Sequence, residues 1–326
     1  MAEGQPWRVP YLLLGLLITS AAFPLFAEKY YVDLMVRIMI LSVFALSLQL
    51  LVGQTGLVSF GHAAFFGIGA YVAAMLSPQS GPASFWILFP AALVAAGLYG
   101  LAVGALSLRT RGIYFIMVTL AFAQMAYYVF HDTAVGGGSD GIYLYFRPDV
   151  SIGSARLLDL SEPRTFYFFV LAALALTFLL LKALQASRFG RALDGIRINE
   201  QRMRAAGFAT YPYKLAAFVI AAMLAGVAGF IHALKDGYVN PEILSWHQSG
   251  AVLLMVILGG LGSLHGAVFG AIAFVALQEF YQSQAIFGNL AKHWQLPLGL
   301  TIILLVALMP NGLTGVRAWA RTRKPA

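Results

Sequence analysis

The chain has 326 residues, of which 60% are hydrophobic and only 10% are charged; its formal net charge is +8 and it contains no cysteine. Because a soluble domain carries about 25% charged residues, most of this surface must face lipid, and we expect an all-α polytopic membrane protein forming one domain over 1–326. The cysteine count excludes a disulfide scaffold and a thiolate metal site. The basic excess is typical of cytoplasmic loops, so no nucleic-acid partner is expected.

Continuous apolar runs recur along the chain, and a bilayer core needs about 20 apolar residues per helix. They are too long for the alternating strands of a barrel. The first run could pass for a signal peptide, but its basic region is weak and it lacks an A-x-A cleavage site, so we expect a retained span. With two ambiguous stretches, about eight to ten helices are expected, some of them broken or half-length. The expected spans are 11–27, 34–52, 57–76, 84–107, 112–130, 165–184 and 213–234, with the ambiguous stretches at 249–281 and 296–310.

The charges of the loops predict the orientation of the chain. Residues 182–214 hold seven Lys or Arg against two acids, so the loop 185–212 is expected to be cytoplasmic. The loop 131–164 holds five acids and three arginines and is expected in the periplasm. The tail 311–326 has four basic residues and no acid, which predicts a cytoplasmic C-terminus.

A glycine-rich, hydrogen-bonding stretch, GQTGLVSFGH at 53–62, interrupts an apolar run. Backbone groups freed by such a break cannot face lipid, so the stretch must be buried in protein or line a wet cavity. A solute pathway is one interpretation; tight helix packing for the glycines, and a helix cap for the polar residues, are the others. The candidate pathway residues are Gln54, Thr55, Ser59, Gly61 and His62.

A second glycine-rich stretch lies in the last third of the chain. Gly262, Gly266 and Gly270 follow a four-residue spacing that predicts one helix face, and we interpret them as packing residues. The segment SLHGAVFG (263–270) also resembles SFGHAAFFG (59–67) with one gap. Matched broken segments are typical of transporters built from repeats, and chance similarity is the alternative.

Charged residues that could power transport are scarce in the expected spans. Glu279 is the single acid deep in an apolar run, and no arginine is expected within a span to hold a solute carboxylate. No glycine precedes any lysine, so the phosphate-binding motif G-x-x-x-x-G-K-[ST] is absent, and no metal-ligand spacing occurs. We therefore expect no cofactor in this chain and, if transport is ATP-driven, an ATPase on separate subunits.

The basic loop contains a candidate docking helix within SRFGRALDGIRINEQRMRAAGFATYPYK, 187–214. Asn199 is a plausible N-cap, Glu200 suits the positive helix start and Gly207 suits the stop. Glu200 and Arg204 form a favourable i,i+4 pair. A helix this short needs a surface to rest on, and that surface is either a partner protein or anionic lipid.

The same loop carries a family resemblance. GRALDGIRINEQRMRAAGF, LVGQTGLVSFGHAAFFGIGAYVAA, LLMVILGGLGSLHGAVFGA and LPLGLTIILLVALMPNGLTG resemble segments of the branched-chain amino-acid ABC importer permeases of the LivM type, over about 40–315. The resemblance implies a type II importer permease fold in the bacterial inner membrane. It also implies a second permease of the LivH type, two ATPase subunits that bind ATP and Mg, and a periplasmic binding protein.

By the same resemblance, one group of residues would contact the ATPase: Arg191, Asp194, Gly195, Ile196, Arg197, Asn199 and Glu200. The subunit itself would perform no covalent chemistry. The family moves branched-chain and other amino acids, urea, short amides and small carboxylates, so the solute stays open at this point. A secondary carrier working alone is the alternative from another functional class.

Overall fold

The structure, a computed structural model, describes residues 23–24, 26–152, 155–309 and 312–315. The expected first span, 11–27, and the basic tail, 311–326, lie largely outside these residues. Within the described residues, seven segments are long and apolar enough to cross a membrane, which confirms an all-α polytopic membrane protein. They are α2 (Lys29–Thr55), α4 (Phe85–Ser107), α5 (Ile113–Asp132), α6 (Pro163–Ala186), α9 (Thr210–Asp236), α11 (Leu264–Gln282) and Gln295–Gly315, which begins with α13 (Gln295–Leu308).

Two shorter apolar helices, α3 (His62–Met75) and α10 (Trp246–Gly259), account for the broken segments. Each has 14 residues, or about 21 Å of helix, which is shorter than a bilayer core of about 30 Å. Residues 56–61 precede α3 without helical structure, and the short 3-10 helix η3 (Pro241–Leu244) precedes α10. The ambiguous stretch 249–281 is thus a half-length helix followed by a spanning one.

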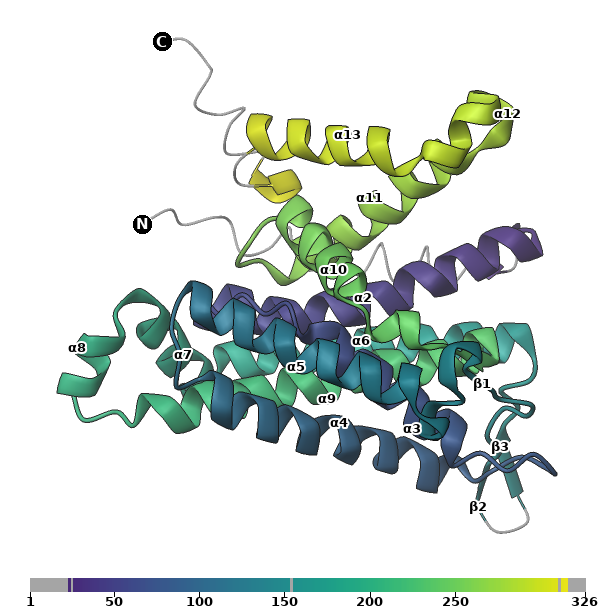
Figure 1. Ribbon diagram of the computed structural model, residues 1–326, viewed down its shortest axis with the longest axis horizontal. Coiled ribbons are helices and arrows are strands. Elements are labelled where there is room, and N and C mark those ends of the chain that lie inside the picture. The colour runs from purple at the N-terminus through teal and green to yellow at the C-terminus, as the bar shows by residue number, and fades with distance from the viewer. Residues whose placement is uncertain (1–22, 25, 153–154, 310–311, 316–326) are drawn as a thin grey trace.

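Helix α9 lies at the centre of the bundle and packs against α2, α3 and α4. Small residues permit this close packing: Gly69 of α3 lies against the backbone of Gly226, and Gly229 of α9 lies against the Phe66 carbonyl. On the other side of α2 lie α10, α11 and α13, with α13 outermost (Figure 1).

The two ends of the bundle differ in structure. At one end, which we call the sheet end, β1 (Ile142–Tyr143) pairs antiparallel with β4 (Tyr238–Val239) (Figure 1). At the other, the α8 end, α7 (Arg188–Ile198) and α8 (Glu200–Ala205) project beyond the long helices (Figure 1). The remaining short elements are η1 (Ala134–Gly136), η2 (Gly138–Asp140), β2 (Val150–Ile152), β3 (Ala155–Leu158), α12 (Gln284–Phe287) and η4 (Gly288–His293).

The helix ends explain the chain reversals that create the half-length helices. Gly56 ends α2 with φ +71°, a left-handed conformation that residues with a Cβ adopt rarely. The chain then enters the bundle as the non-helical segment 57–61 and resumes as α3. The amide of Ala63, in the first turn of α3, donates to the Ser249 hydroxyl of α10 at 2.9 Å. The starts of the two half-length helices therefore meet inside the protein.

Candidate functional site

The projecting helices α7 and α8 form the first candidate region. One face of α7 is apolar and buried against the bundle, through Ala192, Leu193 and Ile196. Helix α7 contacts α2, α6 and α9. The surface on which α7 rests is therefore its own protein. The polar face of α7 is largely exposed, and α8 projects beyond the bundle with Glu200 and Met203 partly buried.

The local sequence signals of α8 act as expected. The Asn199 side chain accepts a hydrogen bond from the Arg202 amide at 2.9 Å and caps the helix. Glu200 and Arg204 form an ion pair of 2.6 Å across one turn. Gly207, with φ +86°, follows the helix and reverses the chain. The short helix is thus defined by three residues within the loop.

Glu200 joins α8 to the start of α9. Its carboxylate also accepts from the Lys214 ammonium at 2.8 Å and the Thr210 hydroxyl at 2.9 Å. Burial raises the pKa of Glu200, but the hydrogen bonds from Lys214 and Thr210 and the charge of Lys214 outweigh burial, and the pKa falls to about 2. The carboxylate is therefore ionised throughout the physiological range, and the α8–α9 contact is constant there.

We expect the Glu200→Gln variant to loosen α8, because the amide cannot pair with two cations. Backbone amides of α8 should exchange with deuterium several-fold faster than in the wild type at pH 7. Since the folded pKa lies below the unfolded value, the stabilisation is complete above about pH 4.5 and is lost as pH falls towards 2. Protection in the wild type should accordingly be equal at pH 7 and pH 5; a decline between them would contradict the assignment. Glu162→Gln, at the start of α6, is the matched control.

Arg197, at the end of α7, is exposed, and its guanidinium reaches back to α2. Its guanidinium donates to the carbonyl oxygen of Gly53, in the last turn of α2, and lies beside Gly262 in the turn between α10 and α11. Gln49 of α2 reaches the same turn. When the side-chain amide oxygen of Gln49 faces the turn, this oxygen accepts from the backbone amides of Gly262 and Ser263 at 2.7 and 3.0 Å. We call Arg197, Gly53, Gln49 and Gly262 the coupling junction. Sequence reasoning missed Gln49, whose neighbours give no signal.

The other expected ATPase-contacting residues divide between two faces. Arg191 and Asn199 are exposed and Asp194 and Glu200 are partly exposed, whereas Ile196 is buried and Gly195 lies against the Met203 side chain. A residue that sequence reasoning missed, Ile198, is 82% exposed at the end of α7. The available signal was its departure from the apolar face of this helix.

The broken segment between α2 and α3 is only partly buried in protein: Gly56 is exposed, whereas Ser59 and Gly61 are buried. The amide of Phe60 donates to the Thr119 hydroxyl at 3.3 Å, and that of Gly61 to the Ser59 hydroxyl at 3.2 Å. A Cβ on Gly61 would meet the carbonyl group of Thr119. Two of the amides freed by the break are thus satisfied, one by α5 and one by the segment itself. All five candidate pathway residues are buried: Gln54, Thr55, Ser59, Gly61 and His62.

His62 packs as a structural histidine. Its Nε2 lies 2.8 Å from the Ser47 hydroxyl, and its ring stacks on Phe44 with centroids 5.7 Å apart. The edge of the ring meets Phe65. These contacts hold the start of α3 against α2, while the Nδ1 of His62 is buried and has no hydrogen-bond partner in the described part of the chain.

The second glycine stretch differs in part from expectation. Gly262 is not on a helix: it lies in the turn between α10 and α11 with φ +94°, because the chain must reverse there. Gly266 and Gly270 lie on α11, where a Cβ would meet the carbonyls of Gly259 and Met255 of α10. These two glycines therefore set the close approach of α10 and α11.

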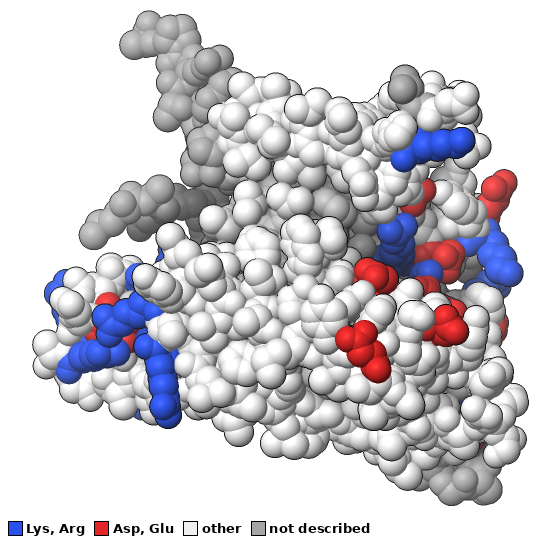
Figure 2. All heavy atoms as spheres, viewed as in Figure 1, with Lys and Arg blue, Asp and Glu red and all other residues white. Residues whose placement is uncertain are grey.

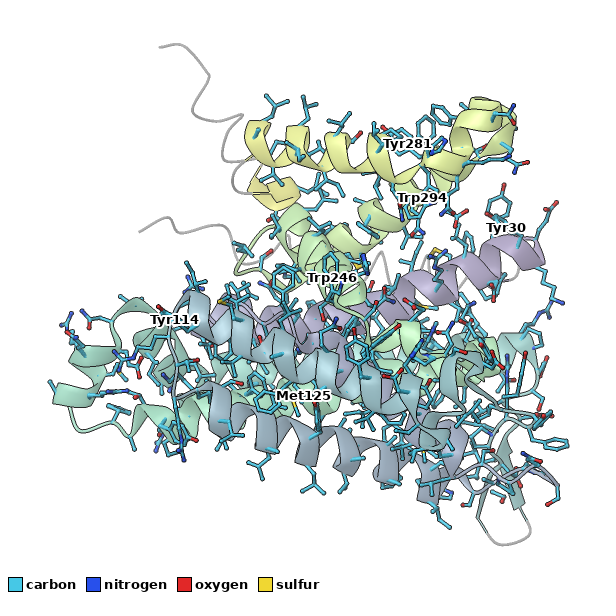
Figure 3. All side chains as sticks on the ribbon, in the orientation of Figure 1. Tyr30, Tyr114, Met125, Trp246, Tyr281 and Trp294 are labelled. Carbon is cyan, nitrogen blue, oxygen red and sulfur yellow. The ribbon has the colours of Figure 1, made fainter. Side chains whose placement is uncertain are left out.

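A pocket of about 770 Å³ forms the other candidate region, at the sheet end between α2, α10, α11 and α13. Figure 2 shows a hollow there around which basic and acidic side chains gather. Tyr30 of α2, Trp246 of α10 and Trp294 before α13 surround it (Figure 3). None of the five candidate pathway residues lines this pocket.

Ion pairs cross the mouth of the pocket. Arg37 of α2 lies 3.3 Å from Glu279 of α11, and Tyr30 donates to the same carboxylate at 2.8 Å. Lys235 of α9 lies 3.2 Å from Asp33. The expectation that no span holds an arginine is wrong, because Arg37 lies within the expected span 34–52. A single charge hardly changes the average hydropathy of an apolar run and is therefore easily missed.

No metal site accompanies these charges: among the residues that the structure describes, no three His, Asp or Glu side chains lie close enough to hold an ion. What the pocket offers is two ion pairs, Arg37–Glu279 and Lys235–Asp33, at the mouth of largely apolar walls. The coupling junction, at the opposite end of α2, offers a mechanical link between helices.

Comparison with known proteins gives a consistent result. A family described as the permease component of branched-chain amino acid transport systems matches residues 30–309. The high-affinity branched-chain amino acid transport system permease protein LivM of Escherichia coli (strain K12) is 29% identical over 95% of this chain and 76% of its own length. LivH of Salmonella typhimurium is 25% identical, and BraD of Pseudomonas aeruginosa 23%, each over 83% of this chain and 90% of its own. No solved structure matches the chain significantly.

Proposed function

The chain belongs to the permease-component family of branched-chain amino acid transport systems, and from this premise we propose that it forms half of the translocation pathway of an ATP-driven importer. The solute is a branched-chain or related amino acid, as the names of LivM, LivH and BraD state for those proteins. The chain matches LivM and LivH together, which supports pairing with a second, related permease subunit.

The proposed orientation follows from the charges at the two ends. The α8 end, with its excess of Lys and Arg, is cytoplasmic, and the sheet end, with the acidic loop 131–164, is periplasmic. Helix α13 runs from the sheet end back towards the α8 end, so the C-terminus is cytoplasmic (Figure 1). A periplasmic binding protein delivers the solute at the sheet end.

The energy comes from two ATPase subunits that bind ATP and Mg and dock at the α8 end. This assignment is supported by the absence of a phosphate-binding motif in the sequence and by the projecting α7–α8 pair. Closure of the ATPases displaces α7, and Arg197 transmits the displacement to α2 and to the α10–α11 turn. The pocket lies between these same helices, so the movement changes access to it.

The single observation that carries the proposal is the coupling junction, because it joins α7 to α2 and to the α10–α11 turn, and α2, α10 and α11 line the pocket. A stand-alone carrier has no use for such a connection. The broken segment 53–62 begins at the junction, since it contains Gly53, and would bend as α2 moves. Urea and short amides are the alternative solutes within this family. They are tested by supplying each of them in place of the amino acid and measuring uptake.

Ile198 provides the test of docking. Burial of an isoleucine contributes about 1.5–3 kcal/mol, so Ile198→Asp should weaken ATPase binding by more than tenfold. The chain is purified through a tag from cells that express the whole gene cluster, and the co-purified ATPase is measured. Val135→Asp, at the sheet end and 53% exposed, is the matched control and should retain the ATPase. Equal ATPase recovery with Ile198→Asp would contradict the proposed docking surface.

A further inference from the structure

The pocket at the sheet end is deep enough to hold a solute well inside the membrane. Its lining runs along α2 from Tyr30 to Leu41, which is about 16 Å of helix. This is about half the thickness of a bilayer core. Its volume of about 770 Å³ falls within the range of about 300–1,000 Å³ that is usual for small-molecule sites.

The chemistry of the walls changes with depth. The mouth holds the Arg37–Glu279 pair, with Gln278 accepting from the second guanidinium nitrogen at 3.2 Å. Below it, apart from His232 of α9 beside Phe66, the side chains are aliphatic or aromatic, and they come from five helices. These deeper residues are Ile40, Leu41, Phe66, Met255, Phe274 and Ile302.

The ion pair at the mouth can exchange partners. Its nitrogen–oxygen distance of 3.3 Å exceeds the about 2.7–2.9 Å of a strong charge-assisted hydrogen bond. The side chains of Arg37 and Glu279 are 40% and 27% exposed, so both are accessible to a solute. An incoming carboxylate can take the guanidinium while an incoming ammonium takes the carboxylate, and no charge is then left without a partner.

We propose that this pocket binds an aliphatic α-amino acid as its zwitterion, with Arg37 holding the carboxylate, Glu279 holding the ammonium and the apolar walls receiving the side chain. The proposal rests on the proposed transport function and adds the residues that recognise the solute within the permease. A neutral amide carries no charge, so it could not replace either partner of the Arg37–Glu279 ion pair. A simple carboxylate would displace Glu279 from Arg37 and leave the acid without its counterion.

This chain contains no cysteine, so a single cysteine introduced into it permits a direct test of the proposal. A single cysteine is introduced as Leu254→Cys, in the pocket wall, in the assembled transporter in membranes, which is first shown to take up leucine with ATP. The rate of labelling by a polar maleimide is then measured against added leucine. We expect leucine to slow labelling; 4-methylpentanoate, which lacks the ammonium, and 3-methylbutylamine, which lacks the carboxylate, should need at least tenfold higher concentrations.

Variants of the pair separate recognition from structure. In the Leu254→Cys background, Arg37→Gln and Glu279→Gln should each raise the leucine concentration for half-protection at least tenfold. The double exchange Arg37→Glu with Glu279→Arg should assemble but stay impaired, because the two charges are reversed relative to the apolar walls. A pair that only fastens α2 to α11 would instead be restored by this exchange. Val135→Cys, outside the pocket, should show no protection.

The outcomes also separate this proposal from the importer function. Unchanged half-protection in Glu279→Gln, restoration by the double exchange, or equal protection by urea would overturn the assignment of the pocket. ATP-driven leucine uptake with no protection of Leu254→Cys would overturn it too, while the importer function stands. If the assembled wild-type transporter accumulates no amino acid, both fail.

Discussion

Replacing Arg197 by alanine is expected to leave ATP hydrolysis running while the amount of solute moved per ATP falls at least about tenfold. The guanidinium joins α7 to the Gly53 carbonyl of α2 and lies beside Gly262. A hydrogen bond to a charged group contributes about 1.5–3 kcal/mol, and about 1.4 kcal/mol changes an equilibrium tenfold. Without this bond, α7 keeps only its apolar packing against α2, so movement of α7 displaces α2 less. The measurement is leucine uptake and phosphate release in the same proteoliposomes.

The Arg197 experiment needs two comparisons. Arg202→Ala removes a charge from exposed α8 and should leave the ratio of uptake to hydrolysis unchanged. Co-purification of the ATPase distinguishes the two roles of Arg197: retention of the ATPase by Arg197→Ala supports the junction, whereas its loss assigns Arg197 to ATPase docking. An unchanged transport ratio would remove Arg197 from the mechanism altogether.

The second large effect is expected at Gly61, where replacement by leucine should abolish assembly or uptake. A Cβ at this position would meet the backbone carbonyl group of Thr119, which cannot move without displacing α5. Overpacking of a core costs about 1–3 kcal/mol even where side chains can adjust, and here the obstruction is backbone. The start of α3 would therefore separate from α5 beside the broken segment. The measurements are the yield of folded complex, its melting temperature and leucine uptake.

Two other glycines provide graded controls for Gly61→Leu. Gly81 has open space around it, so Gly81→Leu should behave as the wild type. Gly97 faces the flexible Met223 side chain at 3.0 Å, so Gly97→Ala should cost little stability. Wild-type yield and uptake in Gly61→Leu would show that the broken segment tolerates a large side chain and would contradict the packing described here.

Local features of this protein could be predicted from the sequence. Helix α8 depends on Asn199, Glu200 and Gly207, which lie within nine residues of chain, and their chemistry is local. The apolar runs predict the spans because a helix that crosses the lipid core needs about 20 apolar residues. The break at 53–62 can be predicted from its glycines and polar residues. That Thr119 and Ser249 are its neighbours in the fold cannot be predicted in this way.

Features assembled from distant residues could not be predicted. Arg37 and Glu279 are 242 residues apart, and no pattern in either helix shows that they meet. The candidate pathway residues come from a local break in an apolar run, which does not show where a pocket forms, and none of them lines the pocket. Gly262 fits a helical spacing, but the reversal between α10 and α11 requires its positive φ.

In the proposed mechanism, the permease has no power source of its own and is moved through Arg197 by ATPases that dock at the α8 end. The most direct test compares the purified chain alone with the complete transporter in sealed proteoliposomes, each given leucine, binding protein and ATP. The account predicts accumulation of leucine against its gradient only by the complete transporter and only with hydrolysable ATP. Concentrative uptake by the chain alone, driven by an ion gradient without nucleotide, would contradict it.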